Sequence, residues 1–180
     1  NNGREYAPLI AEQKTWKVGW YPISQSQTPQ MITTYYFEGD TIIGGQTAKR
    51  MLCDKVSSID GEWRETKKEY VGAWYEQDRK VYCTFPDEDQ FRLLYDFTLN
   101  VNEQITIYNQ QAGAEWLGVV SGMYLGGNNH FKGVTHFIKT PGNVSETQQD
   151  KSWSISWLEG VGGTGIPTDN IGNELSEYCL

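Results

Sequence analysis

The chain has 180 residues, the usual size of one domain and enough to bury a substantial core. Its 15 Lys and Arg against 23 Asp and Glu give a formal net charge of −8 at pH 7, which disfavours nucleic acid and anionic membrane surfaces as partners. No apolar run approaches the roughly 20 residues of a membrane-spanning helix. The hydrophobic share of 38% is too high for a disordered chain. We therefore expect one folded, acidic, all-β domain over residues 1–180 with no membrane-spanning segment.

Apolar and polar residues alternate with period two along most of the chain, which is the pattern of antiparallel strands with one buried face. The clearest examples are residues 16–20, 91–99 and 153–157, where large apolar side chains occupy every second position. Further strands are predicted, in chain order, over residues 31–43, 46–53, 67–75, 80–85, 103–110, 115–125 and 131–139. Only two short helices are expected, near residues 5–14 and near residues 171–178.

Turn-forming residues separate these predicted strands. Gly44-Gly45 can supply the positive φ values of a two-residue hairpin, and Asp78-Arg79 suggests a second tight turn. Further breaks are predicted at residues 86–89, 126–129 and 141–143. Nine or ten short strands joined in this way predict an antiparallel meander. The expected fold is a partly closed, calycin-like barrel or a β-sandwich, with at most short helices.

The spacing of the cysteines and histidines does not match that of a metal site. Cys53, Cys83 and Cys179 lie far apart without a C-x-x-C pair, so buried free thiols are favoured over one disulfide, whose pairing stays open. His130 and His136 would lie about 20 Å apart on an extended strand, too far to share a zinc ion. No metal and no cofactor are therefore expected.

The sequence also lacks a catalytic signature. Residues 160–165 spell G-x-G-x-x-G, but no helical run follows, so a glycine corner is favoured over a nucleotide site. Ser121 is not part of a nucleophile elbow. Five carboxylates lie on or beside predicted strands, but sequence alone does not pair them across a cleft: Glu38, Asp40, Asp96, Glu115 and Glu159. We do not expect an enzyme.

Trp63 lies in a predicted polar loop, unlike the five tryptophans that the alternation assigns to the core. Charged residues flank it on both sides, so it is either a lid over the core, the favoured interpretation, or an exposed contact. As an exposed contact, Trp63 is the candidate ligand-binding residue. Five other tryptophans fit core positions: Trp16, Trp20, Trp74, Trp153 and Trp157.

Four short segments together carry a family resemblance. They are an E-G-D-T-x-I-x-G hairpin within residues 36–45, a K-V-Y hairpin within 72–82, L-L-Y-D-F within 93–99, and W-x-E-G-x-G over 157–162. In this order they resemble uncharacterised secreted or surface β-rich proteins of gut and oral Bacteroidetes. The resemblance implies an all-β fold and a secreted or outer-surface location, and it allows a lipid anchor upstream of Asn1. It implies no known reaction, and under it Glu159 and Gly160 form a structural corner.

These observations predict a non-catalytic exported surface protein of unknown function that binds a glycan or a protein partner. Exposed aromatic side chains and polar loop groups would make the contacts. The first alternative is a calycin-like barrel that encloses a small apolar ligand. The second is a glycan-cleaving enzyme, which needs two carboxylates facing each other in an open cleft.

Overall fold

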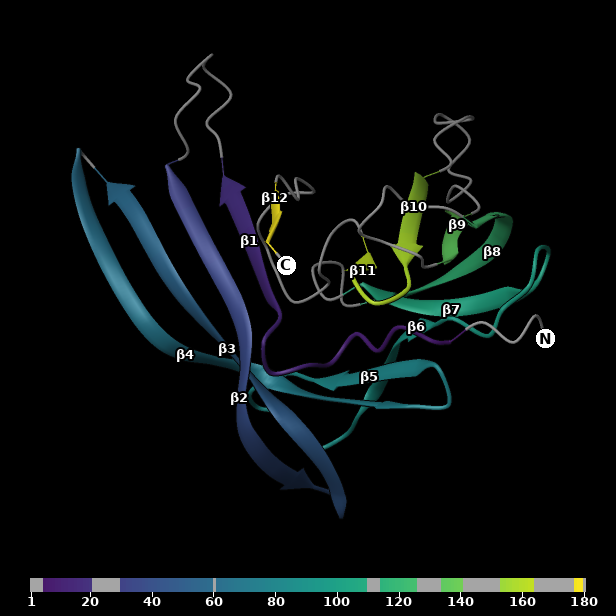
Figure 1. Cartoon of the computed structure of the whole chain (residues 1–180), viewed down its shortest axis with the longest axis horizontal. Coiled ribbons are helices and arrows are strands. Elements are labelled where there is room, and N and C mark those ends of the chain that lie inside the picture. Colours follow the sequence, from purple (N-terminus) through teal and green to yellow (C-terminus); the bar gives the residue numbers. More distant parts are fainter. Residues whose placement is uncertain are drawn as a thin grey trace. The chain divides into compact units, whose positions relative to one another are not determined.

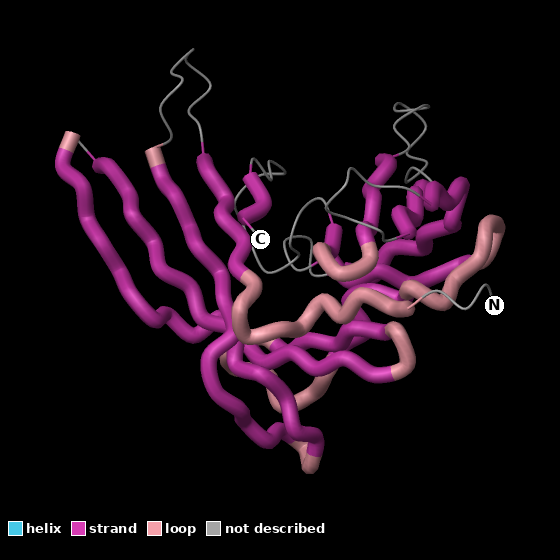
Figure 2. The backbone as a smooth tube through the Cα atoms, viewed as in Figure 1, coloured by secondary structure: helices cyan, strands magenta, loops and turns pink. Residues whose placement is uncertain are grey.

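The computed structural model describes residues 5–20, 30–59, 61–109, 114–125, 134–140, 153–163 and 177–179. Over these residues the regular secondary structure is all strand, with no helix (Figure 2). The strands form two antiparallel, curled sheets (Figure 1). The predicted all-β class is therefore confirmed, and the curled sheets are consistent with a barrel or a sandwich. None of the described segments is a helix that is long and apolar enough to cross a membrane.

The larger sheet has seven strands in the order β12-β1-β2-β3-β4-β5-β6. Most neighbours in this sheet are also neighbours along the chain, as the predicted meander requires. The strands are β1 (Thr15–Trp20), β2 (Met31–Ile43), β3 (Gln46–Ile59), β4 (Glu62–Gln77), β5 (Lys80–Thr84), β6 (Arg92–Asp96) and β12 (Glu177–Cys179).

The smaller sheet has five strands in the order β11-β10-β9-β8-β7, so it too is a meander. Its register pairs Ile138 of β9 with Val120 of β8 on one side and with Ile155 of β10 on the other. The strands are β7 (Gln104–Asn109), β8 (Ala114–Leu125), β9 (Val134–Thr140), β10 (Trp153–Leu158) and β11 (Gly162–Gly163).

The chain divides into two compact units that are interleaved in the sequence. The first unit contains Asn1–Leu9, Glu76–Val81 and Leu93–Pro167. The second unit contains Ile10–Tyr75, Tyr82–Arg92 and Thr168–Leu180. Each unit thus joins three separate stretches of chain. That residues 1–180 act as a single domain stays a prediction.

Two tight turns form as the sequence predicts. Gly44 and Gly45 connect β2 to β3 with φ of 58° and 85°, the left-handed conformation that a two-residue hairpin turn requires. Asp78 and Arg79 connect β4 to β5 with φ of 52° and 63°. Aspartate tolerates this conformation better than most residues, whereas arginine is uncommon there. The arginine is therefore held at a strained position, and its role in the first unit is described below.

Aromatic side chains fill the core of the second unit. The ring of Phe37 makes edge contacts with Trp16 at 5.6 Å and with Trp74 at 5.8 Å between centroids. Such edge-to-face pairs contribute about 0.5–1.5 kcal/mol each beyond the burial of their area. Trp16, Trp74 and Trp157 are buried as predicted, whereas the side chains of Trp20 and Trp153 lie outside the described residues.

The core of the first unit is built around Tyr95. Its ring packs on Trp157 of β10 at 5.4 Å and on Phe97 at 5.8 Å between centroids. Gly162 and Gly163 of β11 lie against the same ring, and a Cβ at either position would approach its atoms to within about 3.2–3.4 Å. The glycines thus let the last strand of the sheet approach the aromatic core closely.

Both predicted helices need correction. Residues 5–14 contain no helix, and residues 5–9 form an irregular segment whose backbone amides bond to distant carboxylates. Of the second predicted helix, residues 171–176 lie outside the described part, and Glu177–Cys179 is strand β12, paired with β1. Long-range hydrogen bonds thus replace the predicted helical ones in residues 5–9 and, of the second helix, in Glu177–Cys179.

Several strand boundaries also differ from the prediction. β3 continues to Ile59 and β4 begins at Glu62, so this hairpin is longer than the alternation indicated. The added part of β4 is exposed throughout, and a strand without a buried face shows no hydrophobic period. β6 ends at Asp96, because the chain turns there. The predicted turns at 126–129 and 141–143 lie outside the described residues.

Cys53 and Cys83 are buried free thiols, as predicted, and the side chain of Cys179 lies outside the described residues. Burial raises the pKa of the Cys83 thiol to about 12, and the nearby Glu88 carboxylate acts in the same direction. The reactive form of a thiol is the thiolate, so little of the reactive form exists at neutral pH.

Thiol labelling tests this arrangement. In a Cys179→Ser variant, we expect a thiol reagent to label neither remaining cysteine in native buffer at pH 7.5 and to label both in denaturant. Mass spectrometry after timed quenching counts the labelled thiols. Labelling of Cys83 in the native protein as fast as in denaturant would contradict its burial.

Candidate functional site

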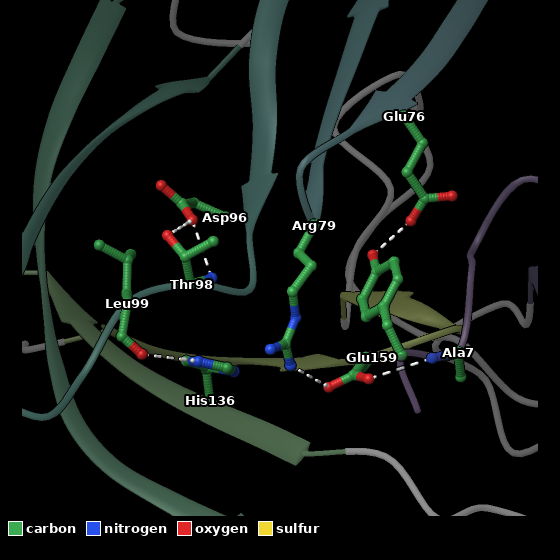
Figure 3. A network of polar contacts seen from close by, with 9 residues as sticks. Ala7, Glu76, Arg79, Asp96, Thr98, Leu99, His136 and Glu159 are labelled. Carbon is green, nitrogen blue, oxygen red and sulfur yellow. Dashed lines mark hydrogen bonds and ion pairs between the residues drawn. The ribbon is translucent and has the colours of Figure 1, made fainter. Parts of the chain in front are cut away.

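A cluster of polar side chains lies inside the first unit and surrounds Glu159, in the turn between β10 and β11 (Figure 3). The Glu159 side chain is 0% exposed. One carboxylate oxygen, Oε1, accepts a hydrogen bond from the backbone N–H of Ala7 at 3.1 Å. The other, Oε2, lies 3.4 Å from Nη2 of Arg79. A buried carboxylate needs a countercharge and hydrogen bonds, and Arg79 and Ala7 supply one of each to Glu159.

A second carboxylate holds the N-terminal segment. Glu76, near the end of β4, accepts hydrogen bonds from the backbone N–H of Leu9 at 3.0 and 3.1 Å and from the hydroxyl of Tyr6. Burial raises the pKa of the Tyr6 hydroxyl, and its bond to Glu76 raises it further. Residues 5–9, here called the N-terminal strap, are thus fixed at three points by Glu76 and Glu159.

Arg79 occupies the centre of this cluster. Its carbonyl accepts the backbone N–H of Phe97 at 3.0 Å, which fixes the β4–β5 turn on the chain that follows β6. Its guanidinium carbon lies 5.3 Å from the centre of the Tyr6 ring, a cation–π geometry. The side chain is 39% exposed overall, although its Nε atom is buried. The strained turn therefore places one cation between an aromatic ring and a buried carboxylate (Figure 3).

Asp96 closes the chain turn after β6. Its Oδ1 accepts hydrogen bonds from the backbone N–H of Thr98 at 2.9 Å and from the Thr98 hydroxyl at 2.5 Å. Its Oδ2 lies 3.3 Å from Nζ of Lys80. This is an Asx-type turn, in which a short acidic side chain bonds the backbone two residues ahead. It explains why the predicted strand over 91–99 stops early.

His136 of β9 is wholly buried on the inner side of the smaller sheet. Its Nε2 lies 3.0 Å from the carbonyl oxygen of Leu99, and because a carbonyl only accepts, Nε2 donates. The ring also packs on Phe97 at 5.9 Å between centroids. Burial lowers the pKa of His136, and Arg79 lowers it too, against the opposing influence of Leu99, Glu159 and Asp96.

The buried imidazole makes stability depend on pH. The pKa of His136 is below its ordinary value of 6.5 in the folded protein, so the unfolded chain binds the proton more tightly. Its contribution to the free energy of unfolding is therefore complete above pH 6.5 and is lost as the pH falls through the folded value. The loss has a slope of at most about 1.4 kcal/mol per pH unit.

Urea unfolding at pH 8, 7, 6 and 5 measures this dependence. We expect the wild-type protein to exceed a His136→Gln variant in stability most at pH 8, and the difference to shrink below pH 6.5. Other titrating groups, including His130, are common to both proteins and cancel in the difference. A difference that stays constant or grows toward pH 5 would refute the assignment.

The cluster does not form a metal centre among the described residues, where no group of three His, Cys, Asp or Glu side chains is placed to hold an ion. Its carboxylates instead bind backbone amides, hydroxyls and cations of the chain itself. The cluster holds the N-terminal strap in place. Two of its buried polar atoms, one on Arg79 and one on His136, have no hydrogen-bond partner among the described residues.

A different surface of the first unit carries exposed aromatic side chains. Phe137 of β9 and Tyr124 of β8 are 43% and 61% exposed. Phe137 pairs with Gly122, and Tyr124 pairs with Thr135, so both rings lie on the side of the sheet opposite the buried His136 and Ile138. Without a side chain on Gly122, the Phe137 ring can lie across β8, where a Cβ would be 3.9 Å from its Cδ2. We call Leu117, Tyr124 and Phe137, all exposed, the aromatic face.

Trp63 lies in the second unit, on β4 opposite Ser58, and not in a loop. Its side chain is 53% exposed, so it is an exposed contact and not a lid on the core. That Trp63 binds a ligand remains a prediction. Its strand neighbours Glu62, Arg64 and Glu65 are exposed and charged.

The other sequence candidates are dispersed. Glu38 pairs with Lys68 at 2.9 Å and Asp40 with Lys49 at 2.7 Å, both on the second unit, whereas Glu115 is exposed on β8. Gly160 has φ of 82° in the turn before β11, so the glycine-rich stretch begins as a corner. A strand follows this corner where the nucleotide fingerprint would need a helix. His130 lies outside the described residues.

The strap contacts could not have been found from local sequence. Ala7 and Glu159 are 152 residues apart, and Leu9 and Glu76 are 67 apart. The only sequence signals are single carboxylates at strand ends, and these are too common to be informative.

Comparison of the chain with models of protein families, with curated proteins and with solved structures gives no match.

Proposed function

We propose that the protein is a non-catalytic, exported surface protein that binds a glycan on the aromatic face of the first unit. The observation that carries this proposal is the pair of exposed rings on adjacent strands, Phe137 and Tyr124. Aromatic rings present large, rigid apolar surfaces, and a tyrosine hydroxyl adds a hydrogen-bonding group at the rim. A sugar ring, with apolar C–H faces and polar edges, matches this combination.

The surroundings of the two rings support a neutral ligand. Thr135 lies beside Tyr124 on β9, and Ser156 of β10 pairs with Phe137, so both hydroxyl side chains share the sheet face with the rings. Leu117 extends the apolar area along β8. Trp63, by contrast, has charged residues of both signs next to it along β4. Export is supported by the resemblance of the four sequence segments to secreted and surface proteins.

Thermal unfolding with a panel of host and dietary polysaccharides tests the proposal. A glycan present at about 100 times its Kd stabilises the native state by about 2.7 kcal/mol, a readily measured shift in Tm. We expect one class of neutral glycan to give a saturable shift. We expect Phe137→Ala and Tyr124→Ala to abolish it while leaving the Tm without glycan within a few degrees, because both side chains are exposed.

Trp63→Ala is the matched control, since it removes an equally exposed aromatic side chain elsewhere. Loss of the shift in Trp63→Ala alone would assign binding to the second unit and reject the aromatic face. A shift with small apolar compounds instead of glycans would favour the calycin-like alternative. If no member of the panel shifts the Tm, glycan binding is rejected.

A further inference from the structure

Two buried atoms in the first unit have complementary, unused hydrogen-bonding capacity. Nδ1 of His136 and Nε of Arg79 have no hydrogen-bond partner among the described residues. Since Nε2 of His136 donates to Leu99, the neutral ring presents a bare lone pair at Nδ1. Arginine is protonated at all relevant pH values, so its Nε presents an N–H. One atom requires a donor and the other an acceptor.

Both residues lie in the first unit, and Phe97 contacts both of them. The backbone of Phe97 bonds to the Arg79 carbonyl, and the Phe97 ring packs on the His136 ring. The charge of Arg79 acts on the imidazole, as do those of Glu159 and Asp96. Figure 3 shows the terminal nitrogen of Arg79 bonded to the Glu159 carboxylate.

We propose that one neutral hydroxyl group binds between Arg79 and His136. Its oxygen accepts a hydrogen bond from Nε–H of Arg79, and its proton is donated to Nδ1 of His136. A buried donor and a buried acceptor that stay unpaired both destabilise the folded state, so an occupied site is strongly favoured. The hydroxyl belongs either to a water molecule or to a sugar or other polyol.

Other ligand classes fit the two atoms poorly. A carboxylate or phosphate oxygen without a proton cannot donate to Nδ1, and it would also be repelled by Glu159 and Asp96. An ammonium group cannot accept from Arg79. A metal ion would lie beside the guanidinium, and the described residues give it no set of three ligands. A hydroxyl group donates and accepts through one oxygen atom, as the pair requires.

Arg79 is the more exposed of the two residues. His136 is fully buried, whereas the Arg79 side chain is 39% exposed. The strap residue Tyr6 lies over the guanidinium on one side. A ligand larger than water would therefore enter beside the exposed part of Arg79, and its hydroxyl would be the group that reaches inward.

Nitrogen NMR of protein labelled with ¹⁵N-histidine tests the proposal, because the Nδ1 resonance reports whether its lone pair accepts a hydrogen bond. A His130→Gln variant assigns the resonances. If water is the ligand, we expect a hydrogen-bonded Nδ1 in buffer alone and a cross-peak between Hε of Arg79 and water. If a polyol is the ligand, we expect a bare Nδ1 in buffer that moves saturably on titration with glycerol or a panel of monosaccharides.

An Arg79→Met variant removes the donor and is expected to return the Nδ1 resonance to its bare position. Arg92→Met is the matched control, because Arg92 pairs with Glu88 at 2.9 Å in the second unit and should leave the resonance unchanged. Should Arg79→Met fail to fold, the wild-type spectra decide alone. A bare Nδ1 in buffer and in every titration, or an Nδ1 shift unaffected by Arg79→Met in the folded protein, overturns the proposal.

Discussion

Replacing Gly72 by alanine is expected to reduce the free energy of unfolding by about 3–5 kcal/mol, the largest loss expected for alanine at any glycine that the structure describes. Gly72 lies on β4 with φ of 147°, a conformation that residues with a side chain rarely adopt. A Cβ built there would overlap the carbonyl oxygen of Thr84 and lie 3.1 Å from its carbonyl carbon. Because the obstacle is backbone, no rotamer change relieves the overlap.

Gly45→Ala is the control that separates backbone strain from steric overlap. Gly45 also has positive φ, 85°, but a Cβ there would meet no atom within 4 Å. Strain alone should cost about 1 kcal/mol. Urea unfolding followed by circular dichroism measures both variants. Similar losses at the two positions would show that β5 does not approach Gly72 as closely as described.

Replacing Arg79 by methionine is expected to cost about 2–3 kcal/mol. The change keeps most of the side-chain length and the same turn, but it leaves the Glu159 carboxylate buried without its cation. Removing one partner of a buried ion pair typically costs about 3–5 kcal/mol. We expect less because the Arg79 side chain is 39% exposed and water can replace part of the interaction.

A double variant identifies the cause of this loss. Glu159→Gln combined with Arg79→Met removes the buried charge and should recover about half of the lost stability, since the amide oxygen can still accept from Ala7. Arg92→Met, which breaks a more exposed pair, should cost less than about 1 kcal/mol. If Arg79→Met costs no more than Arg92→Met, Glu159 does not depend on its cation.

The sequence was most informative where a strand has one buried face. For β2, the alternation ending at the glycine pair gave both boundaries, Met31 and Ile43, as the structure has them. For β4, residues 62–66 were missed because every one of them is exposed and hydrogen bonding to β3 alone defines the strand. Backbone pairing with a neighbouring strand does not require any particular side chains, so such extensions are not predictable from hydrophobic periodicity.

The strap and its polar cluster were missed for a different reason. The pattern near residues 5–14 favoured a helix, but Glu76 and Glu159 bind the amides of Leu9 and Ala7 and keep the strap irregular. From the sequence, Glu159 is interpreted as part of a corner and as one of five carboxylates on or beside predicted strands. Its burial depends on Arg79, a residue recognised from the sequence only as half of a turn. Such a cluster becomes visible only once the strands have placed distant residues together.

The bond between Ala7 and Glu159 also has a consequence for biosynthesis. The ribosome makes the strap well before its carboxylate partner, because Glu159 follows Ala7 by 152 residues. Until Glu159 has been made, Ala7, Arg79 and His136 lack the carboxylate around which the cluster is arranged. The strap therefore cannot be fixed by Glu159 until that residue has been made, and chains that stall before Glu159 should expose residues 5–9 to proteases.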